Sequence, residues 1–120
     1  VVALALMVQH SLSAAETLAK EGIEVEVIDP RTVSPLDTQS IVASVARTGR
    51  LLIVDEAFLP CGIAAEIAAQ VADVGFDELD APIRRVGGAF APTPYSPALE
   101  SAVTPNPAII AQAIRDLLAE

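Results

Sequence analysis

The sequence predicts a three-layer α/β/α fold, in which helices cover both faces of a mainly parallel sheet. Two observations carry this prediction. Short apolar segments alternate with segments of helical spacing, and glycine or proline stands at most of the junctions. The segments expected to form strands are Val1–Met7, Val25–Asp29, Arg50–Asp55 and Pro82–Val86. We expect the strand order 2-1-3-4, so that the order reverses between strands one and three.

Each predicted strand has its own justification. Val1–Met7 is apolar throughout, which is typical of a central parallel strand that is buried on both faces. Val25–Asp29 is rich in β-branched residues and leads into a polar turn, and Arg50–Asp55 is continuously apolar in its middle. The last strand carries Arg84 and Arg85 and is short, so we expect it nearer an edge of the sheet.

The segments between the strands have helical spacing and recognisable ends. Ile63, Ile67 and Val71 recur at i, i+4 and i+8, which indicates one buried helix stripe. Asp37 and Asn106 are predicted N-caps. The predicted helices are His10–Glu21, Asp37–Arg47, one from about Gly62 to Gly75, a short one after Pro97, and a last one that starts at Pro107.

Composition excludes several classes of function. A length of 120 residues, 52% of them hydrophobic, predicts a single domain over residues 1–120. Because the net charge is −9, nucleic acid and anionic membrane surfaces are poor partners. No apolar run approaches the roughly 20 residues of a membrane-spanning helix. One cysteine, Cys61, suits a reducing compartment. Because the chain starts inside a predicted strand without Met, we expect it to be part of a longer polypeptide.

Few side chains are candidates for chemistry. His10, the only histidine, follows strand one, and we interpret it first as an exposed residue with a local hydrogen bond, with an acid–base role as the alternative. Asp55 and Glu56 end strand three, where they could bind magnesium, act as a base or accept turn hydrogen bonds. No Cys/His pair has metal-ligand spacing, and we predict no catalytic, cofactor-binding or metal-binding residue. The candidate interface or crevice residues are His10, Arg31, Glu56, Arg84, Arg85 and Tyr95.

Arginine side chains could tie loops together or meet a partner. Arg31 could join neighbouring loops through an internal ion pair, because its planar fork suits a carboxylate. Arg84 and Arg85 should point to opposite faces of their strand, so one of them should face solvent or a partner.

Five segments in order resemble a known family across nearly the whole chain. They read EGIEVEVIDPRTVSPLD, TGRLLIVDEA, GIAAEIAAQV, DAPIRRVGG and PTPYSPALE. This set resembles the C-terminal domain of transketolase-like enzymes, most closely that of the β subunit of thiamine-diphosphate-dependent 2-oxoacid dehydrogenase E1 components. The segment MVQHSL resembles the pyruvate and acetoin branch. Pro30, where the family usually has leucine, and the shortened turn Leu59–Gly62 depart from the pattern.

The resemblance implies an assembly role rather than catalysis. In such proteins the preceding domain of the β subunit binds the thiamine pyrimidine, and the α subunit binds the diphosphate and magnesium. The partners implied are the E1 α subunit, a second β subunit and the E2 acyltransferase, and the compartment is the cytoplasm, or the mitochondrial matrix in a eukaryote. The alternatives are the same domain of deoxyxylulose-phosphate synthase or transketolase, or a self-contained flavodoxin-like enzyme or ligand-binding module. The last alternative requires His10, Asp55 and Glu56 to converge on one pocket.

Overall fold

A parallel sheet of three strands forms the centre of the computed structural model, which describes residues 1–120. The strands are β1 (Val2–Ala3), β2 (Leu52–Phe58) and β3 (Arg84–Gly88), in the spatial order β1-β2-β3. Five α-helices and one 3-10 turn complete the chain: α1 (Leu6–Ala19), α2 (Thr38–Thr48), α3 (Ile63–Gly75), η1 (Phe76–Glu78), α4 (Pro97–Val103) and α5 (Pro107–Leu118). None of these helices is long and apolar enough to cross a membrane.

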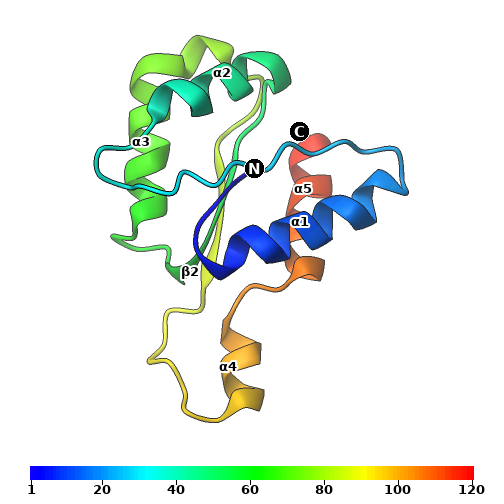
Figure 1. Cartoon of the computed structure of the whole chain (residues 1–120), viewed down its shortest axis with the longest axis vertical. Helices are drawn as coiled ribbons and strands as arrows, with labels where there is room; N and C mark the ends of the chain where they lie inside the picture. Colours follow the sequence, from blue (N-terminus) through cyan, green and yellow to red (C-terminus); the bar gives the residue numbers. More distant parts are fainter.

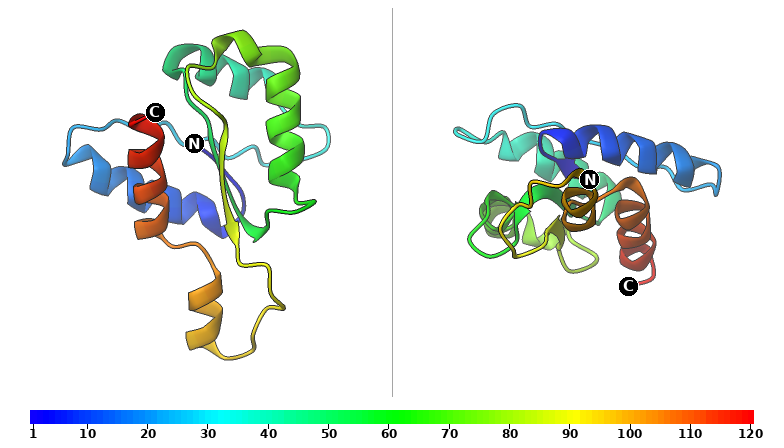
Figure 2. Two further views of the ribbon diagram at one scale, coloured as in Figure 1. Left: turned by 180° about the vertical axis from the view of Figure 1, so that it is seen from behind. Right: turned by 90° about the horizontal axis from the view of Figure 1, so that it is seen from below.

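Helices cover both faces of the sheet, as predicted. Figure 1 shows α2 and α3 on one side of the strands and α1 with α5 on the other, and Figure 2 shows the same layers from behind. Successive residues of β2 enter different cores: Leu52 and Val54 join the core under α1 and α5, and Ile53 joins the core under α2 and α3. The predicted three-layer α/β/α class is therefore confirmed.

The predicted strand order is also confirmed. Val2 lies between Ile53 of β2 and Ile28, and both pairings are parallel. The amide of Ala3 donates to the Ile28 carbonyl over 3.0 Å, and the amide of Ile28 donates to the Val1 carbonyl over 2.8 Å. The predicted strand Val25–Asp29 is thus reduced to a single bridge, because β1 is too short to pair with more of it.

The boundaries of all three sheet strands differ from the prediction. The last strand, expected at Pro82–Val86, begins at Arg84 and continues to Gly88. The expected strand Val1–Met7 ends at Ala3, the chain turns at Ala5 with φ of 48°, and α1 begins at Leu6 rather than His10. A wholly apolar run does not distinguish a buried strand from the buried start of a helix, and Met7 is completely buried in either case. β2 continues past Asp55 to Phe58, because Phe58 pairs with Gly88 of β3.

The predicted helix ends are confirmed at both N-caps. The Asp37 carboxylate accepts from the Ser40 amide over 3.1 Å, and the Asn106 side-chain oxygen accepts from the Ile109 amide over 3.0 Å. Each bond satisfies an amide that the first helical turn leaves without a partner. Gly49 ends α2 with φ of 67°, in the left-handed region that favours glycine.

Residues 89–104 leave the body of the molecule and return to it; we call them the arm. The arm contains α4, none of whose seven residues is buried. Its two ends are joined where the Ala89 amide donates to the Val103 carbonyl over 2.9 Å. Figure 1 shows α4 projecting beyond the carboxyl ends of the strands, away from the other helices.

Two buried serines are predicted to respond oppositely to alanine. Ser11 of α1 is completely buried and its hydroxyl has no hydrogen-bond partner, whereas the Ser44 hydroxyl donates to Glu26 over 2.5 Å. Removing an unsatisfied buried hydroxyl relieves a desolvation cost, so Ser11→Ala should raise the free energy of unfolding by up to about 1 kcal/mol. Ser44→Ala should lower it by about 1 kcal/mol in the same urea titration. A clear loss of stability in Ser11→Ala would contradict this account.

Glu26 is predicted to make stability depend on pH. The hydrogen bond from Ser44, assisted by Arg47, holds the pKa of Glu26 below its ordinary value of 4.5. Because the folded chain then binds this proton more weakly than the unfolded chain, the stabilisation is complete above pH 4.5 and is lost as the pH falls through the lowered value. Urea titrations from pH 6 to pH 3 should show a smaller loss of stability in Glu26→Gln than in the wild type. If the free energy of unfolding fell equally with pH in the two proteins, Glu26 would not be the source of the pH dependence.

Candidate functional site

A cleft of about 330 Å³ lies at the carboxyl edge of the sheet. It is bounded by the start of α1, the end of β2, and the segment that joins α4 to α5. Its polar lining consists of His10, Glu56, Glu100, Ser101, Thr104 and Asn106. Parallel sheets place ligand and partner sites at this edge, so the cleft is the natural candidate site of the domain.

His10 links α1 to the segment after the arm. Its Nδ1 lies 3.0 Å from the Pro105 carbonyl oxygen, and because a carbonyl only accepts, Nδ1 carries the hydrogen. His10 is half-buried and its partner is 95 positions away along the chain, so the prediction of an exposed histidine with a local hydrogen bond is wrong. Its Nε2 has no hydrogen-bond partner within the chain.

Asp55 and Glu56 separate, because neighbouring strand residues point to opposite faces of the sheet. Asp55 is buried and accepts from the Ala57 amide over 3.1 Å, while its second oxygen has no partner. Glu56 is exposed and lines the cleft with His10. The structure therefore brings His10 and Glu56 together and leaves Asp55 outside this cleft, which removes the convergence that the self-contained enzyme requires.

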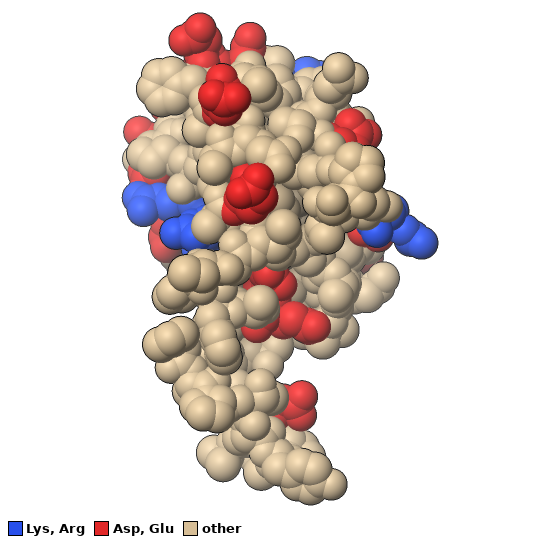
Figure 3. All heavy atoms as spheres, turned by 90° about the vertical axis from the view of Figure 1, so that its left-hand side faces the viewer, with Lys and Arg blue, Asp and Glu red and all other residues tan.

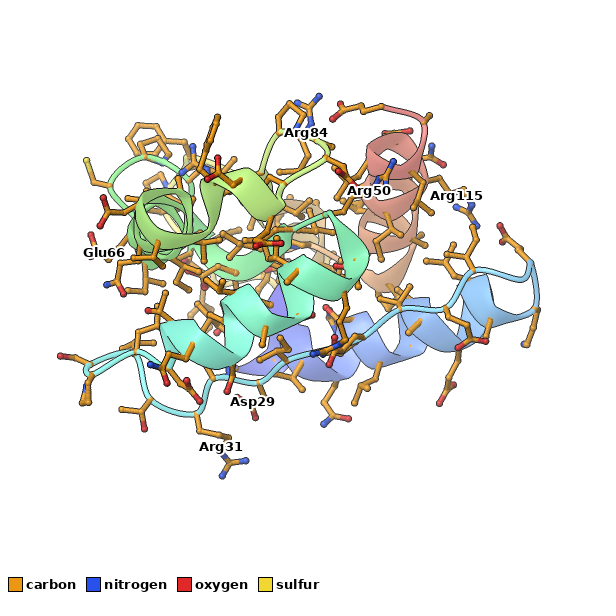
Figure 4. The ribbon with its side chains drawn as sticks, turned by 90° about the horizontal axis from the view of Figure 1, so that it is seen from above. Asp29, Arg31, Arg50, Glu66, Arg84 and Arg115 are labelled. Carbon is orange, nitrogen blue, oxygen red and sulfur yellow. The ribbon has the colours of Figure 1, made fainter.

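The predicted arginine candidates lie outside the cleft. Arg31 extends into solvent and pairs with Asp29 over 3.5 Å, so its ion pair is local and does not join two loops as predicted (Figure 4). Arg84 pairs with Glu120, and the Arg85 guanidinium donates to the Leu59 carbonyl over 3.2 Å. Figure 4 shows Arg84, Arg50 and Arg115 near α5, at the end of the molecule opposite the arm.

The arrangement in the cleft favours binding over bond-making chemistry. The Ser101 hydroxyl donates to the Pro97 carbonyl over 2.9 Å, so it is not activated by His10. No group of three or more His, Cys, Asp or Glu side chains is arranged to hold a metal ion. The carboxylates of Glu56 and Glu100 line the cleft without a Lys or Arg and can attract a positively charged group. The arm adds exposed apolar side chains next to them.

Sequence reasoning identified Tyr95 but missed the rest of the arm. Tyr95 is fully exposed, and Phe90 and Leu99 of the same segment have exposed fractions of 76% and 58%. Phe58 at the end of β2 contacts Phe90, with ring centroids 5.4 Å apart in an edge-to-face arrangement. The sequence does contain a signal for an apolar surface here, because Glu100 is the only charged residue between Val86 and Ile114.

Comparison with known proteins gives the family. Residues 1–110 match the family described as the transketolase C-terminal domain. The chain is 48% identical over 118 residues to the acetoin:2,6-dichlorophenolindophenol oxidoreductase subunit beta of Bacillus subtilis, an alignment that covers 98% of this chain and 34% of that protein. It is 46% identical over 113 residues to the mitochondrial pyruvate dehydrogenase E1 component subunit beta of Saccharomyces cerevisiae, covering 92% and 31%.

A solved structure supports the fold. The split-gene transketolase, an inactive β4 tetramer, superposes with a TM-score of 0.82 at 24% identity, covering 98% of this chain and 37% of that one. The chain spans about a third of the length of these relatives. It therefore belongs to the transketolase C-terminal domain family and is similar, within that family, to the β subunits of acetoin- and pyruvate-oxidising enzymes.

Proposed function

We propose that the chain is the C-terminal assembly domain of an E1 β subunit in a 2-oxoacid dehydrogenase complex. In this proposal the parent enzyme decarboxylates a 2-oxoacid oxidatively and transfers the acyl group to lipoyl groups of E2. The domain contributes contacts with the E1 α subunit, a second β subunit and E2. The parent protein would work in the cytoplasm of a bacterium or in the mitochondrial matrix of a eukaryote.

The observation that carries the proposal is the arm. It contains a seven-residue helix with no buried residue, and Phe90, Tyr95 and Leu99, the last of them in that helix, are exposed. A domain that worked alone would gain little from holding this apolar surface in water. In an assembly the same residues would be covered by another chain, as interface residues are.

The cofactor of the proposed parent enzyme does not fit the cleft in this domain. Thiamine diphosphate is anionic, and the cleft presents Glu56 and Glu100 without any Lys or Arg in its lining. A diphosphate placed there would meet repulsion from both carboxylates. We therefore assign thiamine diphosphate and magnesium to the remainder of the assembly and derive no chemical step on this domain.

Calorimetry tests the proposal directly. Titrating thiamine diphosphate and Mg²⁺ into the 120-residue chain should give no binding heat, and the chain alone should not reduce a dye with acetoin or pyruvate as substrate. Tight cofactor binding or turnover by the chain alone would overturn the assembly role. Either result would show that the chain binds the cofactor or carries out chemistry by itself.

A further inference from the structure

We propose that the arm and the adjacent cleft form one docking surface for a protein segment that presents a lysine or arginine among apolar side chains. The inference rests on the proposed assembly role, because a domain that acted alone would have no partner to dock. The surface has an apolar half and a charged half.

The apolar half is built from Phe58, Phe90, Tyr95 and Leu99. Phe58 and Phe90 pack against each other edge to face at the base of the arm, which gives the aromatic surface a defined shape. Tyr95 and Leu99 extend the exposed surface along the arm. Aromatic side chains held in this way are typical anchors of protein interfaces.

The charged half consists of Glu56 and Glu100. Both line the cleft, and neither takes part in any of the four ion pairs of the chain. No Lys or Arg occurs between Val86 and Ile114 to neutralise them. Figure 3 shows no blue on the projecting part of the molecule, although Asp and Glu are present near its base. A cationic side chain that entered the cleft would therefore meet two unpaired carboxylates.

A second copy of this chain is a poor occupant. Its net charge is −9, so two copies repel each other. Most of its basic side chains are already engaged in ion pairs or in hydrogen bonds to carbonyl oxygens: Arg31, Arg47, Arg50, Arg84, Arg85 and Arg115. Charge complementarity therefore selects a different chain with a basic residue on its contacting face.

A blocked pentapeptide with arginine between two leucines is the probe, and the same peptide with neutral citrulline is its matched control. Both are titrated into the ¹⁵N-labelled 120-residue chain and followed by NMR. The arginine peptide should bind about fivefold more tightly than the citrulline peptide, as expected for a pair of exposed charge contacts. The amides of the chain whose chemical shifts change most on adding this peptide should lie around His10, Glu56 and Glu100. Added salt should bring the affinities of the two peptides together.

Variants separate the two halves of the surface. Glu56→Gln with Glu100→Gln should weaken the arginine peptide about fivefold and leave the citrulline peptide unchanged. Phe90→Ser should weaken both peptides equally. Asp73→Asn with Asp77→Asn makes the same charge change on α3 and η1 and should alter neither affinity.

Three results would overturn the docking surface: equal affinity for the two peptides, shifts centred away from the cleft, or no binding at millimolar peptide. None of these results would change the outcome of the calorimetric test of the assembly role, so the docking surface can be wrong while the assembly role is right.

Discussion

Ile53→Ala is expected to lower the free energy of unfolding by about 3–5 kcal/mol, a large part of the stability of a domain of this size. Ile53 is completely buried in β2, the middle strand of the sheet, and packs in one core with Val2, Ile41 and Ile67. Alanine would remove three carbon atoms and leave a cavity that the flanking strands cannot close. Urea unfolding followed by circular dichroism measures the loss.

Ile109→Ala is the matched control, because it makes the same chemical change on the exposed side of α5. Ile109 has an exposed fraction of 48%, so the substitution should change stability by less than about 1 kcal/mol. Similar losses in the two variants would mean that Ile53 is not the centre of the α2–α3 core.

Gly88→Ala is expected to lower the free energy of unfolding by about 3 kcal/mol and to displace the arm. A Cβ at Gly88 would lie 2.3 Å from the Glu56 carbonyl oxygen, and a main-chain atom in a central strand cannot move aside as a side chain can. The end of β3 would have to shift away from β2. Because Ala89 follows directly, its hydrogen bond to Val103 at the base of the arm should weaken too.

Hydrogen exchange of the Ala89 amide measures the weakening of its bond to Val103 separately from the loss of global stability. Gly22→Ala is the control: it has φ of 80° and open space around it, so it should cost only the left-handed strain of about 1 kcal/mol and leave the arm unchanged. A Gly88→Ala variant with wild-type stability and Ala89 protection would show that the two strands do not approach each other so closely.

The two edges of the sheet have different surfaces. At the amino edge, Arg50 precedes β2 and donates to the Leu117 carbonyl of α5, and Arg84 begins β3 and pairs with Glu120. At the carboxyl edge, the chain carries unpaired carboxylates and the apolar arm. The internal charge contacts therefore stabilise one end of the domain, while the carboxylates Glu56 and Glu100 at the other end take part in no ion pair.

Most of the architecture could be predicted from local patterns. The helix caps at Asp37 and Asn106 depend on contacts within one turn, so the sequence indicates them directly. The end of the first strand could not be predicted, because a run without polar residues carries no periodicity to separate strand from helix. The second strand was limited to a bridge by the short length of β1, its only neighbour in the sheet.

The site could be predicted only in part. The sequence places His10 after the first strand and Glu56 at the end of another, and parallel topology brings such positions to one edge. It does not show that His10 bonds to Pro105, since that pairing depends on how α5 returns across the sheet. Nor does it show that Asp55 is buried while Glu56 faces the cleft, because the strand boundary was misplaced.

The sequence by itself determined the fold class and the caps, because the alternation of segments and the N-cap side chains are short-range signals. It also determined the strand order, because few topologies are open to a parallel sheet covered by helices. Only the tertiary structure decided which carboxylates remain unpaired and that the arm leaves the core. Those outcomes depend on contacts between segments far apart in the chain, such as the closure of the arm by Ala89 and Val103.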